Sequence, residues 1–146
     1  MSIRPLNIYD YSDLYLSLLE QLTLVDKSKI NKEDFENYVN SQNEEWKTYI
    51  YEEKDCFGNS IPLASITILI ERKIIHGMSK VGHIEDVVCD KKLRGKGIGK
   101  KMIDFATEYC MINGCYKVIL DCSEYNIGFY EKCGYKQKGT EMAYYF

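Results

Sequence analysis

A glycine-rich run lies between an apolar stretch at residues 81–89 and an amphipathic segment at residues 98–112. It reads Arg94-Gly95-Lys96-Gly97-Ile98-Gly99-Lys100. Three glycines in five residues let the backbone approach a ligand closely, and the N–H groups at the start of a helix carry partial positive charge that suits a phosphate. The run therefore predicts a strand, a phosphate-binding loop and a helix, with a coenzyme diphosphate as the first candidate ligand. Taken alone, the glycines suit a tight structural turn equally well.

Two common nucleotide-binding loops do not fit this run. A Walker loop ends in Lys followed by Ser or Thr, whereas Gly99 is followed by Lys100 and Lys101. A dinucleotide fingerprint opens an early strand and helix, with an acidic residue on the next strand, whereas this loop lies late in the chain. The Arg-x-x-Gly-x-Gly pattern that remains resembles the acetyl-CoA loop of the GNAT acyltransferases.

Length and composition limit the functional classes. A chain of 146 residues is expected to form one domain, residues 1–146. Its 19 basic and 22 acidic residues give a net charge of -3, which disfavours bulk nucleic-acid binding. No apolar run approaches a membrane span, and the N-terminus lacks the hydrophobic segment of a signal peptide. We expect a soluble, cytoplasmic protein that binds neither nucleic acid nor membranes.

The cysteines and histidines do not form a metal or redox motif. The six cysteines include no Cys-x-x-Cys pair, and the only histidines are His76 and His83. We therefore expect no metal. Most of the thiols fall in apolar patterns, which predicts reduced core residues. A catalytic cysteine stays open as an alternative, although no histidine lies in a partnering motif.

Hydrophobic spacing predicts alternating strands and helices with no linker or repeat. We expect strands at residues 3–6, 46–51, 61–70, 81–89 and 116–122, the second and third forming a hairpin. Helices are expected at residues 10–24 with Asp10 as the cap, after Asn31, and at residues 98–112 and 125–133. Two small strands are expected around Tyr135 and at residues 142–146. The fold class is α/β with a mixed sheet and a central strand–loop–helix–strand crossover.

Further motifs flank the glycine loop and make the resemblance more specific. They are Gly82-His83-Ile84-Glu85-Asp86-Val87-Val88 before the loop, and Cys115-Tyr116-Lys117-Val118-Ile119-Leu120-Asp121-Cys122, Asn126 and Phe129-Tyr130-Glu131-Lys132-Cys133-Gly134-Tyr135 after it. In this order they are similar to the glucosamine-6-phosphate N-acetyltransferases, small GNAT enzymes of UDP-N-acetylglucosamine synthesis. The resemblance is strong over residues 71–142 and weaker before them. It implies a single GNAT domain whose sheet is splayed at the acetyl-CoA site and flanked by helices.

The resemblance implies where acetyl-CoA binds. Its pyrophosphate is expected on the amides of Arg94, Gly95, Lys96, Gly97, Ile98, Gly99 and Lys100. Its pantetheine is expected beside Val87, Val88 and Cys89, whose backbone pairs with it like an added strand. Asn126, Tyr130 and Lys132 match family positions near the coenzyme. Lys96, Lys100 and Lys101 suit the 3′-phosphate or, equally, a solvated surface.

The resemblance also implies the catalytic groups, which are Tyr130, Asp121 and Glu85. Tyr130 is expected to hydrogen-bond or protonate the departing thiolate; without the motif it would be interpreted as a packing residue. Glu85, Asp86 and Asp121 are expected to bind the sugar and its ammonium, and the group that takes the amine proton stays open between one of them and water. Because adjacent strand residues point to opposite faces, only a bulge or a ligand cleft there would expose both Glu85 and Asp86.

The sugar phosphate requires cations, and the matching positions are Lys73, His76, Lys117, Tyr116 and Thr23. Relatives commonly place an arginine in the last strand, reaching the phosphate across a dimer interface, where this chain has Tyr144-Tyr145-Phe146. Lys136, Lys138 or a partner's tyrosine hydroxyls are the open replacements. A homodimer is expected, with residues 142–146 near its interface.

Two other functions stay open from the sequence. One is a GNAT enzyme that acetylates a different amine, such as a protein N-terminus or a polyamine. The other is a catalytically silent acyl-CoA-binding module that regulates a partner.

Overall fold

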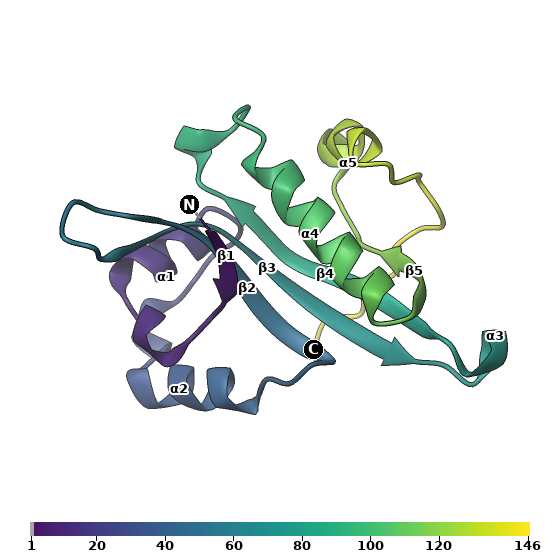
Figure 1. Cartoon of the computed structure of the whole chain (residues 1–146), viewed down its shortest axis with the longest axis horizontal. Coiled ribbons are helices and arrows are strands. Elements are labelled where there is room, and N and C mark those ends of the chain that lie inside the picture. Colours follow the sequence, from purple (N-terminus) through teal and green to yellow (C-terminus); the bar gives the residue numbers. More distant parts are fainter. Residues whose placement is uncertain (1) are drawn as a thin grey trace.

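A five-stranded sheet forms the centre of the computed structural model, which describes residues 2–146 (Figure 1). The strands lie in the order β1 (Ser2–Pro5), β2 (Trp46–Lys54), β3 (Ser60–Arg72), β4 (Lys80–Cys89) and β5 (Cys115–Ile119). The first four strands pair antiparallel, and β5 pairs parallel with β4. The predicted mixed sheet and the β2–β3 hairpin are therefore confirmed.

Helices cover both faces of this sheet. They are α1 (Asp13–Leu19), α2 (Lys32–Ser41), α3 (Ile75–Met78), α4 (Ile98–Ile112) and α5 (Ile127–Lys132), with the short 3-10 turns η1 (Ile8–Asp10), η2 (Lys27–Lys29), η3 (Lys91–Leu93) and η4 (Glu124–Asn126). In Figure 1, α1 and α2 lie on one side of the sheet and α4 and α5 on the other. Across the described part of the chain, none of these helices is both long and apolar enough to traverse a bilayer.

Helix α4 is the main packing element on its side of the sheet. It starts at Ile98 and ends at Ile112, as predicted, and buries the apolar stripe Ile98, Met102, Ile103, Ala106 and Cys110. The helix crosses β4 so closely that a Cβ atom at Gly82 would collide with the side chain of Cys110. Glycine at this strand position therefore lets the helix approach the sheet that carries the site.

The other face has a smaller core beneath α1 and α2. Its buried members are Leu6, Tyr15, Leu18, Phe35, Ile50 and Val88. Helix α2 begins as predicted after Asn31, whose side chain accepts from the N–H of Asp34 at 2.8 Å. The hydroxyl of Tyr15 and that of Ser65 on β3 lie 3.1 Å apart, so α1 also has a polar contact with the sheet.

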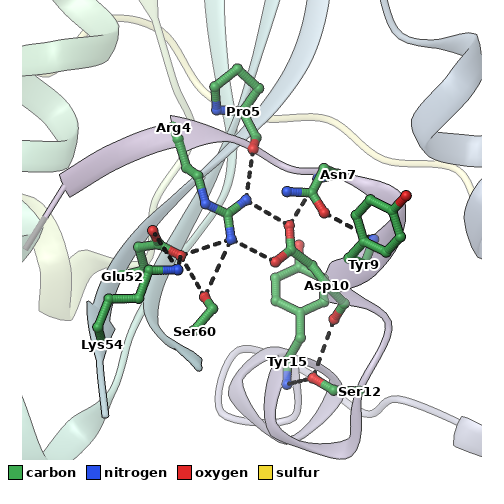
Figure 2. Close-up of polar contacts among 10 residues, drawn as sticks. All are labelled: Arg4, Pro5, Asn7, Tyr9, Asp10, Ser12, Tyr15, Glu52, Lys54 and Ser60. Carbon is green, nitrogen blue, oxygen red and sulfur yellow. Dashed lines mark hydrogen bonds and ion pairs between the residues drawn. The ribbon is translucent and has the colours of Figure 1, made fainter. Parts of the chain in front are cut away.

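The prediction for the first helix was wrong at both ends. The cap is Ser12, whose hydroxyl accepts from the N–H of Tyr15 at 3.3 Å, and the helix ends at Leu19 rather than near residue 24. Asp10 is instead recruited by Arg4 of β1, as Figure 2 shows. A carboxylate held by a guanidinium and by the N–H of Asn7, at 2.8 Å, is not available to cap a helix that starts three residues later.

Arg4 lies at the centre of a polar cluster that holds β1 to its neighbours (Figure 2). Its guanidinium donates to both carboxylate oxygens of Asp10 at 2.7 and 2.8 Å and to Glu52 of β2 at 2.7 Å. Ser60 of β3 adds a contact at 3.2 Å. The cluster thus ties β1, η1, β2 and β3 together with charge-assisted hydrogen bonds, which are stronger than neutral ones.

Three further predictions differ from the structure. Residues 136–146 form no helix or strand, so the two small strands expected around Tyr135 and at residues 142–146 are absent from the described chain. Strand β5 ends at Ile119 rather than at residue 122, because its pairing with β4 stops there. Of the six free cysteines only Cys110 is buried, whereas Cys56 and Cys122 are exposed, so the prediction of core thiols was too broad.

Candidate active site

The sheet opens between β4 and β5. Their pairing runs from Lys80 opposite Cys115 to His83 opposite Ile119, while β4 continues to Cys89. Beyond His83, the described part of β4 pairs with β3 and no longer with β5. The other backbone edge of β4 therefore faces the gap left by β5, and amide groups of a ligand can pair with it.

A β-bulge at the start of this opening presents two carboxylates. Thr67 of β3 pairs with Glu85 and Ser65 pairs with Val88, so two residues of β4, Asp86 and Val87, stand opposite one residue of β3. Asp86 has a φ of +49°, a left-handed conformation that Asp tolerates better than most residues. Glu85 and Asp86 are both exposed, and of the two explanations that the sequence left open, a bulge or a ligand cleft, the strand register shows the bulge.

The predicted carboxylates influence one another electrostatically. The pKa of Glu85 is raised, first because its exposed side chain is still partly desolvated in the opening and then by the negative charges of Asp86 and Asp121. Asp121 follows β5 on the opposite side of the opening from the β4 bulge. Glu141, in the C-terminal segment, contributes to the same effect. Glu141 was not predicted from sequence, because it lies outside every helix and strand of the described chain and belongs to no motif.

The glycine loop lies where β4 ends. Gly95 and Gly97 have φ values of +81° and +79°, which favour glycine, and a Cβ atom on either would meet no atom within 4 Å. Gly97 caps α4 without a side-chain hydrogen bond, so the first amides of that helix point out of its N-terminus. These features make an open cradle lined by backbone N–H groups, as a diphosphate requires.

Within this loop, the amides differ in their hydrogen bonds. The N–H groups of Arg94 and Lys96 donate to the carbonyls of Lys91 and Leu93 at 3.4 and 3.1 Å. In the described chain no backbone carbonyl accepts from the amides of Gly95 or of residues 97–100, although that of Gly99 lies near the Cys89 thiol, so these amides are the better donors for an anion. The side chain of Lys100 pairs with Asp104 at 2.7 Å on the surface.

Tyr130 lies on α5, the helix that follows β5 in the chain. Its ring packs against Phe129 and Tyr135, with centroids 5.0 and 6.3 Å away. Burial raises its pKa to about 12, so the phenol is protonated throughout the neutral range and acts as a donor. A Cβ atom on Gly99 would lie 3.2 Å from the Phe129 ring, which shows how closely α5 approaches the glycine loop.

The remaining coenzyme candidates lie in or beside α5 and at the end of β4. Asn126 closes η4 and Lys132 ends α5, and both are exposed. Burial and the charge of Asp90 raise the pKa of the Cys89 thiol. A nucleophilic cysteine needs a lowered pKa, so this shift disfavours a catalytic role for Cys89, whose side chain packs against the hydrophobic core.

The residues predicted for the sugar phosphate fall into separate groups. His76 and Tyr116 stack with ring centroids 4.5 Å apart, and the Lys117 ammonium lies 5.5 Å from the Tyr116 ring. Lys73 pairs with Glu71, which also contacts Nε2 of His83 at 2.9 Å. Thr23 lies elsewhere, in the lining of a cavity of about 360 Å³ beneath α1 and α2, together with Asp86. His76, Tyr116 and Lys117 therefore lie together, whereas Thr23 lies near Asp86 of the β4 bulge.

Comparisons with known proteins agree with this geometry. Residues 11–135 match the model of the acetyltransferase (GNAT) family. A glucosamine 6-phosphate N-acetyltransferase of Candida albicans is 41% identical over 97% of this chain and 93% of its own length. The Arabidopsis thaliana enzyme of the same name is 39% identical over 99% and 95%.

Solved structures give the same result. The crystal structure of the Arabidopsis thaliana enzyme has a TM-score of 0.89 and covers 99% of this chain and 97% of its own, at 39% identity. An acetyltransferase of Trypanosoma brucei has a TM-score of 0.87 at 32% identity and covers 99% of both chains. This chain therefore belongs to the GNAT acetyltransferase family and, within it, to the glucosamine 6-phosphate N-acetyltransferases.

Proposed function

We propose that this chain transfers the acetyl group of acetyl-CoA to the 2-amino group of glucosamine 6-phosphate by direct attack in a ternary complex. The observation that carries the proposal is the opening between β4 and β5. It joins an unpaired strand edge, a glycine cradle and a group of carboxylates in one place. The names of the relatives supply the identity of the aminosugar.

The coenzyme is proposed to bind along β4. Val87, Val88 and Cys89 offer backbone groups for the pantetheine amides, and the amides of Gly95 and residues 97–100 hold the diphosphate. The Lys100–Asp104 pair is a surface contact of low strength, so it does not prevent Lys100 from turning to a phosphate. Acetyl-CoA supplies the thioester carbonyl, and a β4 amide near Val87 is placed to polarise it.

The acceptor amine is proposed to lie among Glu85, Asp86 and Asp121. An ammonium is attracted to this negative group and must lose one proton before it attacks the thioester. Glu85, with its raised pKa, is a stronger base than an ordinary glutamate, so it suits direct removal of that proton or removal through water. Tyr130 keeps its proton on the phenol, since its pKa is raised to about 12, and donates a hydrogen bond to the sulfur of the departing thiolate.

The phosphate of the sugar is proposed to lie near the His76, Tyr116 and Lys117 group. Lys117 supplies a positive charge and Tyr116 a hydroxyl donor, both exposed to solvent. Lys73 is held by Glu71 in an exposed pair of little strength, from which a dianion can recruit it.

A homodimer completes this end of the site in our proposal. Met142, Tyr144, Tyr145 and Phe146 are each more than 80% exposed, as expected of a segment that lacks its packing partner. Tyr116 and Ile119 on β5 are 43% and 40% exposed and offer a second apolar surface at the sheet edge. Association of two copies through these surfaces would bring tyrosine hydroxyls to the place that arginine occupies in relatives.

Steady-state kinetics with several acceptors tests the proposal. We expect kcat/KM for glucosamine 6-phosphate to exceed that for unphosphorylated glucosamine, because only the former uses Lys117 and its neighbours. A higher kcat/KM for a peptide N-terminus or a polyamine would identify that amine as the acceptor. The assignment of GNAT acetyl transfer would stay unchanged. Tight coenzyme binding without acetylation of any amine would instead support a silent binding module.

A further inference from the structure

One hydrogen bond joins the connection between α1 and α2 to the segment that enters the glycine loop. The side-chain oxygen Oε1 of Gln21 accepts from the backbone N–H of Lys91 at 2.8 Å, across 70 residues of sequence. Lys91 begins η3, and the residue that ends this turn, Arg94, is the first residue of the glycine loop. The side chain of Gln21, which follows α1, thus contacts the backbone of the segment that leads into the proposed diphosphate loop.

The bond completes the start of η3. Asp90 caps this turn, because its carboxylate accepts from the N–H of Lys92 at 2.8 Å and its carbonyl accepts from that of Leu93 at 2.8 Å. The N–H of Lys91 is not reached by this cap and uses Gln21 instead. Without Gln21, that amide would turn to water, and the approach to the glycine loop would lose one of its anchors.

The other end of the bond belongs to a segment near the acceptor site. Gln21 follows α1 in a turn in which its own N–H donates to the carbonyl of Leu18 at 3.1 Å. The next residues, Leu22 and Thr23, line the cavity that also contains Asp86. The other side-chain hydrogen bonds and ion pairs of residues 20–30 in the described chain stay within the α1–α2 region, such as those of Lys27 with Ser17 and Glu20.

We infer that Gln21 is a positioning residue that couples binding of the acceptor to binding of the coenzyme. The inference rests on the proposed function, because it places the diphosphate after η3 and the aminosugar beside Asp86. Coenzyme bound after η3 would order the Lys91 end of the bond, and aminosugar bound beside Asp86 would order the Gln21 end. The second ligand to bind then meets a segment that the first has already ordered through this bond. The coupling is reciprocal, since each ligand raises the affinity of the other by the same factor. For a single hydrogen bond of this kind, that factor is about twofold to tenfold.

Calorimetric titration of coenzyme A measures this factor without turnover. Coenzyme A carries no acetyl group, so its complex with glucosamine 6-phosphate cannot react. We expect the Kd of coenzyme A for the unmodified chain to fall about twofold to tenfold when the sugar is saturating. In Gln21→Ala the two Kd values should become equal. Gln21→Glu, which keeps an oxygen acceptor at the same reach, should restore the difference.

Gln42→Ala is the matched control. Gln42 also accepts from a backbone N–H, that of Thr48 at 3.0 Å, but it joins α2 to β2 and does not contact η3. Both alanine variants lose an amide-to-backbone bond, so a loss of stability is expected in each. Only Gln21→Ala should lose the coupling.

The outcomes separate this inference from the proposed function. A chain that acetylates glucosamine 6-phosphate but shows equal coupling in its unmodified form and in Gln21→Ala overturns the role of Gln21 alone. Absence of coupling in the unmodified chain overturns it as well. A chain that binds coenzyme A and never acetylates the sugar overturns the proposed acceptor, and with it this inference.

Discussion

Glu52 provides a quantitative test of the polar cluster around Arg4. Its side chain is 6% exposed, and the hydrogen bond from Arg4 holds its pKa at about 2 instead of 4.5, although burial opposes this. The difference between these values corresponds to about 3 kcal/mol of stability. Because the folded-state pKa is the lower one, this stability is fully present above pH 4.5 and is lost as the pH falls through 2.

Glu52→Gln should therefore be less stable by about 3 kcal/mol at pH 7, and the gap should fall to about 1.5 kcal/mol at pH 3. Urea unfolding followed by the fluorescence of the single tryptophan, Trp46, measures both values. Glu53→Gln removes the same charge from the neighbouring residue without touching Arg4 and serves as the control. A gap that is equal at pH 7 and pH 3 would show that the Arg4 contact is not the source of the stability.

Three predictions concern the reaction. Tyr130→Phe should keep the fold and lower kcat at least tenfold, to about a hundredth if the phenol acts as an acid; undiminished turnover would exclude that role. Lys117→Ala should raise the KM for glucosamine 6-phosphate about tenfold and leave the KM for glucosamine nearly unchanged, and an unchanged sugar-phosphate KM would remove Lys117 from the site. The raised pKa of Glu85 predicts that kcat/KM falls as the pH drops toward that value, with a midpoint above that of an ordinary glutamate; the same acid limb in Glu85→Gln would assign it to another group.

Local sequence signals were sufficient for helix α4, which follows the proposed coenzyme loop. Helix α4 has both of its ends as predicted, because an apolar stripe of helical spacing is bounded by glycines on one side and by Asn113-Gly114 on the other. The adjacency of Glu85 and Asp86 indicated an interruption of the strand's alternating faces, by a bulge or a ligand cleft, and only the register of β4 against β3 shows that it is a bulge.

Contacts between distant segments were the part that could not be predicted. Asp10 has the residue type and position of a helix cap, and only the folded chain brings Arg4 and Glu52 to it. Similarly, nothing in the sequence near Gln21 indicates Lys91 as its partner. The residues at 142–146 have the composition of a strand, but a strand needs a neighbour to pair with, and the described chain offers none to them.

A crystal structure with coenzyme A bound tests the central claim most directly. We predict the diphosphate on the amides of Gly95 and residues 97–100, with the pantetheine paired to the β4 edge at Val87, Val88 and Cys89 and the sulfur within reach of the Tyr130 hydroxyl. Coenzyme density elsewhere, with that strand edge and glycine loop left to solvent, would contradict it.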